Sequence, residues 1–203
     1  MPYSIDASSA DCYEGTTVLI NKLGIKDEKQ LEENESFITL VKSAELETHP
    51  LSMSFDFDHY KAVHKYLFED LYDWAGTVRT INFSKKNTVF CPANEIERIG
   101  TSLFEYLKSQ NYFETAHHSD FSKSIAEFYH EVNMLHPFRE GNGRTQRAFF
   151  TQLIRHAGYD INFKDVDMDM LMIATIHAAN GVSTYLIDLF SACIIDVYET
   201  TAG

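Results

Sequence analysis

The sequence has few cysteines, and their placement argues against a disulfide framework or a zinc site. Cys12, Cys91 and Cys193 are odd in number and far apart in the chain. None has the close-spaced partner that a zinc site or a redox-active dithiol requires. A reducing compartment fits this pattern best, and we expect the protein to be cytoplasmic.

Long hydrophobic runs are also missing. Residues 1–15, MPYSIDASSADCYEG, lack both the basic start and the apolar stretch of a secretory signal peptide. No apolar run elsewhere is long enough to span a bilayer. We therefore expect a soluble intracellular protein without a membrane partner, although a signal for injecting a bacterial effector into a host cell would not be visible in this way.

Basic residues are scarce, with 17 Lys and Arg against 30 Asp and Glu and a formal net charge of −13. A charge of this sign disfavours attraction of the whole molecule to nucleic acid or to anionic lipid, so we expect no nucleic-acid partner. An anionic ligand would have to be held by a local basic cluster. Arg139, Arg144 and Arg147 form such a cluster in the sequence.

What the chain does contain is enough apolar residues for one core. It has 203 residues, of which 44% are hydrophobic and 13% aromatic, and no repeat, low-complexity tract or interdomain linker is visible. We expect a single domain over residues 1–203. Its core should cover about 55–198, with an N-terminal helical extension at 1–54.

Helical periodicity dominates the sequence, since apolar residues recur at spacings of three and four. Asp27 with Gln30 resembles a capping box, and the helix that follows is expected to bury one apolar stripe. This stripe consists of Phe37, Leu40, Val41 and Ala44. Further helices are expected at about 58–76, 92–107, 119–135, 143–158, 165–179 and 183–198.

One segment breaks the helical pattern. VRTINF at 78–83 alternates and is rich in β-branched residues, SKKN at 84–87 is a polar turn, and TVF at 88–90 resumes the apolar pattern. Residues 78–91 are therefore expected to form a short β-hairpin. The sequence thus predicts an all-α fold with one short hairpin.

Residues 136–147, HPFREGNGRTQR, carry the groups expected of a phosphate-handling site. A histidine ordinarily titrates near neutrality and can take a proton from a hydroxyl, a carboxylate can hold a divalent cation, and arginines grip phosphates. Two glycines let an anion approach the backbone at the start of a helix. Together these groups predict transfer of a phosphorus-containing group.

The same twelve residues resemble the signature of the Fic family, HxFx(D/E)GNGRxxR, at every fixed position. The resemblance implies a Fic-type helical domain in which the hairpin is a flap. It also implies a protein adenylyltransferase, an enzyme that moves AMP from ATP to a hydroxyl side chain of a target protein. Such an enzyme uses ATP as co-substrate and Mg²⁺ as cofactor.

The resemblance implies a role for most motif residues. His136 is expected to be the general base that deprotonates a Ser, Thr or Tyr hydroxyl of the target. Glu140 is expected to coordinate Mg²⁺ on the α- and β-phosphates. The residues expected to bind the phosphates of ATP are Arg139, Gly141, Asn142, Gly143, Arg144 and Arg147.

The flap is expected to dock a segment of the target by strand addition beside the active site. Lys85 and Lys86 at its tip could contact the target, although a solvated turn is the commoner role for such residues. The flap residues expected to take part are Thr80, Ile81, Asn82, Phe83, Lys85, Lys86, Thr88 and Phe90.

Gly141 favours AMP transfer within the family, because phosphorylating relatives carry alanine at the first glycine of the GNG turn. Two alternatives stay open. One is a catalytically silent module that binds a nucleotide and a partner, and the other is a Fic enzyme that transfers a different phosphate-containing group. His136 and Glu140 favour an enzyme, since binding alone needs neither.

Inhibition is expected to come from a separate small protein. Many Fic enzymes are inhibited by a helix with the pattern (S/T)xxxE(G/N), whose glutamate pairs with the second motif arginine. Only partial matches occur here, at 43–47 and 101–105, and neither is followed by Gly or Asn. We therefore expect an antitoxin to supply the glutamate to Arg147, as in the toxin–antitoxin class of the family.

Other polar residues are expected to have structural roles. His117 and His118 should be exposed loop residues rather than metal ligands. The acidic run EENE at 32–35 should be a solvated helix face. The remaining histidines outside the motif, such as His64, lack a matched partner in the sequence.

Overall fold

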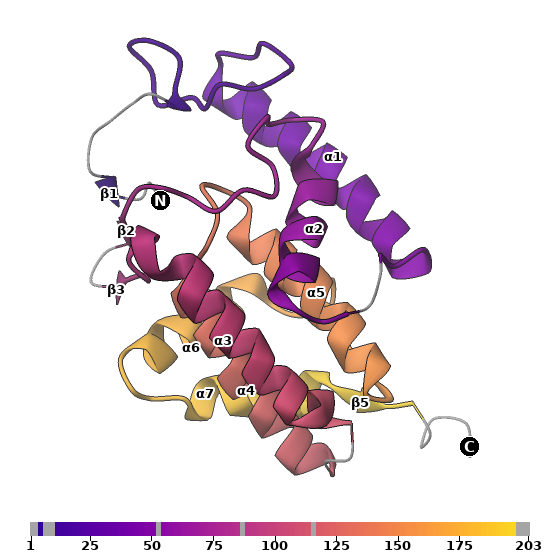
Figure 1. Ribbon diagram of the computed structural model, residues 1–203. Coiled ribbons are helices and arrows are strands. Elements are labelled where there is room, and N and C mark those ends of the chain that lie inside the picture. The colour runs from indigo at the N-terminus through magenta and orange to yellow at the C-terminus, as the bar shows by residue number, and fades with distance from the viewer. Residues whose placement is uncertain (1–3, 6–10, 52–53, 86–87, 115–116, 198–203) are drawn as a thin grey trace.

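The structure, a computed structural model, describes residues 4–5, 11–51, 54–85, 88–114 and 117–197, and seven α-helices are found among them (Figure 1). The predicted all-α class is confirmed. The helices are α1 (Glu28–Thr48), α2 (Phe57–Phe68), α3 (Ile96–Ser109), α4 (His118–Leu135), α5 (Asn142–His156), α6 (Met168–Ala179) and α7 (Thr184–Cys193). Two 3₁₀ turns, η2 (Ala93–Glu95) and η3 (Asn111–Phe113), flank α3. No helix in the described ranges is both long and apolar enough to cross a membrane.

The helices pack around one aromatic core that reaches the motif. Phe149 of α5 makes edge contacts with Tyr60 of α2 and Phe104 of α3, at ring-centroid distances of 5.3 and 5.5 Å. Tyr60 in turn stacks on Phe138 of the motif at 5.6 Å. Each buried aromatic ring removes a large apolar area from water. The loop before α5 is therefore anchored in the core through Phe138.

Helix α1 packs with the opposite face from the one expected. Phe37, Leu40 and Val41 are 68%, 57% and 44% exposed, so the prediction that they line the core is wrong. The buried residues of α1 are Leu31, Glu35, Thr39 and Leu46, which face α2 and α5. Periodicity defines a face of a helix but does not say what the face meets, and here α5 offers an arginine that attracts the polar side of α1.

The second helix ends earlier than expected. Helix α2 stops at Phe68, and Leu71 and Trp74 lie in the loop that follows rather than in the helix predicted to run to residue 76. Leu71 is still fully buried. The apolar periodicity after Phe68 thus marks buried residues of the core rather than further helix. Gly76, with φ +83°, lies in the loop.

The hairpin is shorter than expected and has an additional strand. Strands β2 (Phe83–Lys85) and β3 (Thr88–Val89) pair antiparallel, while residues 80–82 precede β2 and Phe90 follows β3. Lys86 lies outside the described residues. The third strand, β1 (Ser4–Ile5), pairs with β2 in the order β1-β2-β3, a pairing between distant segments that local patterns did not indicate.

The C-terminal region also differs in detail from the expected pair of helices. Helix α7 ends at Cys193, and β5 (Ile195–Asp196) then pairs with β4 (Tyr159–Asp160), which follows α5. His117 is exposed as expected, but His118 begins α4, and its Nε2 lies 2.9 Å from the carbonyl oxygen of Ile194. The prediction of an exposed loop residue at 118 is therefore wrong, because the C-terminal strand returns to this point.

Candidate active site

His136 lies at the end of α4 in a strained backbone conformation. Its φ of 43° is in the left-handed region, and its N–H donates to the carbonyl of Val132 at 3.2 Å. The residue is only 7% exposed, and its imidazole stacks on the ring of Phe90 at 3.9 Å. Nδ1 lies 3.3 Å from the carbonyl oxygen of Asn133. Since a carbonyl only accepts, Nδ1 carries the proton in this contact and the basic lone pair is on Nε2.

The loop between His136 and α5 is fixed by its own hydrogen bonds. The side chain of Asn142 accepts from the N–H of Phe138 and donates to its carbonyl, both at 2.8 Å. Asn142 is 5% exposed, and Phe138 is fully buried. The motif asparagine therefore ties both backbone groups of Phe138 to the first residue of α5, which uses one of the two N–H donors of its amide.

His64 supports this loop from α2. Its Nδ1 accepts from the N–H of Gly76 at 2.8 Å, so Nε2 carries the proton and donates to the carbonyl of Glu140 at 3.1 Å. The ring also stacks on Phe138 at 3.8 Å. Burial lowers the pKa of His64 to about 3, so the ring is neutral near pH 7. Sequence spacing gave no sign of this support, since its partners are 12 and 76 residues away.

Gly141 is required both by backbone conformation and by space. Its φ is +79°, and a Cβ at this position would lie 2.2 Å from Cζ of Phe68. An alanine here would force the buried Phe68 ring to move. The N–H of Gly141 donates to Oε1 of Glu140 at 2.8 Å, which turns that carboxylate back toward the start of α5.

Arg144 is already paired with carboxylates of the chain. Its guanidinium forms an ion pair with Glu35 of α1 and lies 3.5 Å from Glu140. The hydroxyl of Tyr72 donates to the other oxygen of Glu35. Burial, together with this carboxylate, raises the pKa of Tyr72. Glu35, 7% exposed, is thus an exception to the solvated face expected at 32–35, whereas Glu32 and Glu33 are exposed as expected.

Arg147 differs from Arg144 in lacking a carboxylate partner among the described residues. Burial lowers the pKa of its guanidinium, and the interaction with Tyr129 opposes this shift. Burial in turn raises the pKa of Tyr129 to about 12, so this hydroxyl stays neutral near pH 7 and does not balance the charge. Arg147 therefore presents a partly buried cation that an anionic ligand could neutralise.

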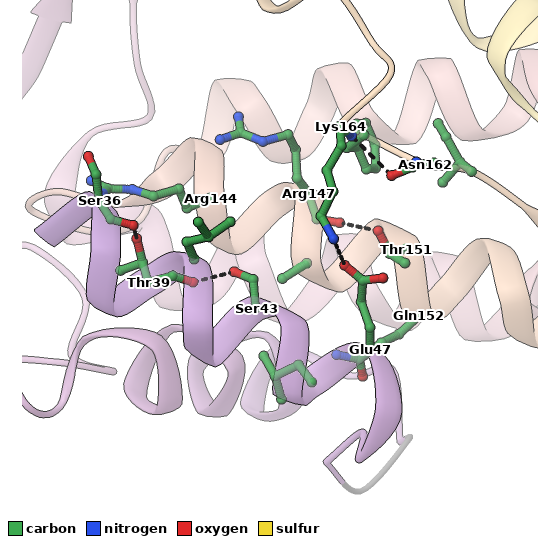
Figure 2. A pocket seen from close by; sticks show the side chains of 15 residues that line it. Ser36, Thr39, Ser43, Glu47, Arg144, Arg147, Thr151, Gln152, Asn162 and Lys164 are labelled. Carbon is green, nitrogen blue, oxygen red and sulfur yellow. Dashed lines mark hydrogen bonds and ion pairs between the residues drawn. The ribbon is translucent and has the colours of Figure 1, made fainter.

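Both arginines reach a groove between α1 and α5. This groove encloses a cavity of about 250 Å³ that both arginines line, and Figure 2 shows the Arg144 side chain extending from α5 toward Ser36. At the other end Glu47 pairs with Lys164 at 3.5 Å and with Arg155 at 3.7 Å. Glu47 is the glutamate of the partial inhibitory pattern at 43–47, and its partners are these two cations.

Arg139 faces the N-terminal segment. Its Nε lies 3.4 Å from a carboxylate oxygen of Asp11, and its guanidinium lies over the ring of Phe83 at 5.5 Å. The two partners come from the N-terminal segment and from β2. Asp11 therefore already balances the charge of the residue expected to be a third phosphate-binding arginine.

The donor set fits a magnesium ion that is bound together with phosphates. No group of three His, Cys, Asp or Glu side chains that could hold a metal occurs in the described part of the chain. Mg²⁺ commonly uses one or two carboxylates and completes its shell with water and substrate phosphates. Glu140, with its side chain 32% exposed beside Arg144, can supply one such carboxylate.

Comparison with known proteins identifies the family. A family model described as Fic/DOC matches residues 54–154. The chain is also 32% identical over 188 residues to "Probable protein adenylyltransferase Fic" of Escherichia coli strain K12, with 93% of each chain covered. The chain belongs to the Fic/DOC family. This confirms the resemblance of residues 136–147 to the Fic signature.

A second Fic relative is longer than this chain. "Protein adenylyltransferase VbhT" of Bartonella schoenbuchensis is 40% identical over 179 residues, which cover 88% of this chain and 37% of that protein. The chain thus spans little more than a third of the length of this relative.

Solved Fic structures share the fold. The BepC protein of Bartonella tribocorum with bound AMPPNP has a TM-score of 0.86 at 26% identity, covering 93% of this chain and 97% of that one. The Fic domain of a putative cell filamentation protein of Bartonella quintana with bound ADP has a TM-score of 0.87, also at 26% identity, covering 94% and 97%. The predicted Fic-type helical domain is confirmed.

Proposed function

We propose that this Fic protein is a Mg²⁺-dependent protein adenylyltransferase, which transfers AMP from ATP to a hydroxyl group of a target protein. The observation that carries the proposal is the placement of His136, with its basic lone pair on Nε2, at the end of α4 and one short loop before the N-terminus of α5. The names of the relatives support the same reaction, and the solved BepC relative contains an ATP analogue.

The proposed chemistry is a displacement at the α-phosphorus. Nε2 of His136 takes the proton of the target hydroxyl as its oxygen forms a bond to the α-phosphorus. The bond from that phosphorus to the oxygen that bridges the α- and β-phosphates breaks, and pyrophosphate leaves. A base of this kind contributes about 10²- to 10⁴-fold in rate. A magnesium ion held through Glu140 would neutralise phosphate charge.

The start of α5 is proposed to bind the phosphates. The backbone N–H groups of Asn142 and Gly143 and the positive end of the helix dipole favour an anion there, whereas the N–H of Gly141 donates to Glu140. Arg144 and Arg147 project from the first turns of the same helix, and Arg147 has the less neutralised charge. Arg139 has less support as a phosphate ligand, because Asp11 is its partner. The hairpin is proposed to dock the target by strand addition.

The test uses ATP labelled at either the α- or the γ-phosphate. The purified chain with Mg²⁺ should label protein from the α position only, and His136→Ala should abolish this labelling. His177→Ala on exposed α6 serves as the matched histidine control and should keep the label. Label from the γ position alone would indicate a kinase, and absence of label from both would indicate a silent binding module.

A separate antitoxin is proposed as the inhibitor, acting through the groove beside Arg147. Two observations support it: Glu47 is held by Lys164 and Arg155, and the apolar face of α1 with Phe37 and Leu40 is exposed beside the groove. Glu47→Gly should leave the rate of the purified chain unchanged. A strong rise in rate would instead show that the inhibitory glutamate is internal.

A further inference from the structure

Arg79 is a buried arginine that connects the hairpin to the histidine of the motif. It is 4% exposed, and its guanidinium donates three hydrogen bonds to backbone carbonyls. Nε donates to His136 at 2.8 Å, one terminal nitrogen to Ile81 at 2.7 Å and the other to Cys91 at 2.6 Å. The backbone N–H of Arg79 also donates to the carbonyl of Pro137 at 2.8 Å. One side chain thus joins both ends of the hairpin to the first residues of the motif.

Burial of the charged Arg79 side chain lowers the stability of the fold, which a side chain that only filled space would not do. Burial lowers the pKa of its guanidinium, and no carboxylate within the described ranges forms an ion pair with it. Its charge is met by carbonyl oxygens and by the ring of Phe83, which lies 5.0 Å away. A buried cation without an acid is generally less stable than an apolar residue of similar volume. The planar guanidinium can, however, span three acceptors in fixed directions.

The contacts of His136 show which groups the three hydrogen bonds of Arg79 hold in place. Its left-handed φ of 43° places the peptide carbonyl where Nε of Arg79 can reach it. On its other side the imidazole stacks on Phe90, at 3.9 Å and an interplanar angle of 15°. Phe90 belongs to the hairpin, because its N–H donates to the carbonyl of Phe83 at 3.3 Å. The backbone and the ring of His136 are therefore both held from the hairpin side.

We propose that Arg79 is a positioning residue, which sets the orientation of the His136 ring and couples it to the geometry of the hairpin. This inference rests on the proposed function, in which His136 is the base and the hairpin docks the target. A target segment that orders the hairpin would then also order the base. The nucleotide is bound from the α5 side and is not affected by this coupling.

The experiment compares wild type with Arg79→Lys and Arg79→Met. Lysine keeps the charge but cannot span three carbonyls, and methionine removes both charge and donors. Arg98→Met is the matched control, because Arg98 is exposed on α3 and pairs only with neighbouring Glu95 in the described part of the chain. Self-labelling from α-labelled ATP gives the rate, calorimetry gives the affinity for AMPPNP with Mg²⁺, and NMR of ¹³C-labelled histidine reports the His136 ring, assigned with His136→Asn.

The expected loss of kcat is about 100-fold for Arg79→Met and about 10-fold for Arg79→Lys, because displacement of a catalytic group by about 1 Å can cost that much. The Kd of AMPPNP should stay within about twofold, since the phosphate-binding groups keep their places. The His136 ring protons should move away from their wild-type shifts as stacking on Phe90 is lost. Arg98→Met should match wild type in all three measurements.

Two results would overturn the inference. One is wild-type kcat and wild-type His136 shifts in Arg79→Met, and the other is a fall in AMPPNP affinity that accounts for the whole loss of rate. If Arg79→Met does not fold, Arg79→Lys and Phe90→Leu decide by the same measurements. If the wild-type chain transfers no AMP, the proposed function fails, and the NMR shifts alone still decide whether Arg79 positions His136.

Discussion

The first turns of α5 present two arginines in contrasting surroundings. On the side of Arg144, α1 supplies Glu35, Tyr72 fixes that carboxylate, and Glu140 adds a second one. On the side of Arg147 the described chain supplies the hydroxyl of Tyr129 and no carboxylate. Two residues of the same type, three positions apart, therefore differ in whether the fold neutralises them.

The two arginines therefore differ in the negative charge that balances them. The fold supplies it for Arg144, and a ligand supplies it for Arg147 under the proposed function. Breaking an ion pair strands the partner left behind, so Arg144 and Glu35 hold each other and hold α1 on α5. Arg147 lacks such a partner among the described residues, so under the proposed function the anion that balances it is a ligand. A nucleotide phosphate and the carboxylate of an inhibitory protein compete for this one cation under the proposed function.

The largest expected effect is on activity at Arg147. Arg147→Met should lower AMP transfer by about 10²- to 10³-fold, the cost of removing one preorganised group that meets developing charge. Its free energy of unfolding should change by less than about 1 kcal/mol, because no buried carboxylate is left unpaired. Rates from α-labelled ATP and urea midpoints measure the two effects, with Arg98→Met, exposed on α3, as the control. Strong destabilisation of Arg147→Met without loss of rate would instead give Arg147 the structural role that we assign to Arg144.

Arg144 should show a larger share of its effect in stability. Arg144→Met leaves Glu35 buried without its cation, which should lower the free energy of unfolding by about 2–3 kcal/mol, below the value for a fully buried pair because Arg144 is partly exposed. Urea unfolding measures this value. The double variant Glu35→Gln with Arg144→Met should recover about 1 kcal/mol of the loss, since the stranded charge is gone. If the two single effects simply add, the ion pair does not hold α1 in place.

Acid should weaken the Arg144 side of the site through His64. The folded-state pKa of about 3 lies below the ordinary 6.5, so the unfolded chain binds the proton first and stability falls as pH drops below 6.5. Between pH 7 and pH 5 this single group should remove about 2 kcal/mol. His64→Gln should remove that part of the slope in urea unfolding at each pH. The same slope in the variant would place the acid-sensitive group elsewhere.

The motif could be predicted because its chemistry is local in sequence. Residues 136–147 lie in one continuous stretch, and the start of α5, at Asn142, differs by one residue from the expected start at Gly143. The supports of the motif could not be predicted in this way. Arg79, His64 and Glu35 meet it from segments between 57 and 109 residues away, and only the tertiary fold brings them together.

Helix α1 shows why the rest of the fold was harder to predict. The apolar stripe at 37–44 and the acidic run at 32–35 were both assigned by the usual preference for burying apolar side chains and exposing charges. The stripe is exposed and Glu35 is buried because Arg144 attracts Glu35 into the α1–α5 contact, whereas Glu32 and Glu33 are exposed as expected. A cation from another helix decided the rotation of α1, and no local pattern contains that information.

The smallest effect on stability, and a selective one, is expected at that exposed stripe. Phe37→Ser should change the free energy of unfolding by less than about 0.5 kcal/mol, because the side chain is 68% exposed and has little burial to lose. It should also leave the rate of the isolated chain unchanged. Leu46→Ser, in the buried face of the same helix, is the contrasting variant and should destabilise by about 2–4 kcal/mol. The urea midpoints of both variants measure the two changes in the free energy of unfolding. Equal losses of stability would mean that the stripe is buried. A much smaller loss for Phe37→Ser would show an exposed apolar face beside Arg147, which the proposed antitoxin could cover.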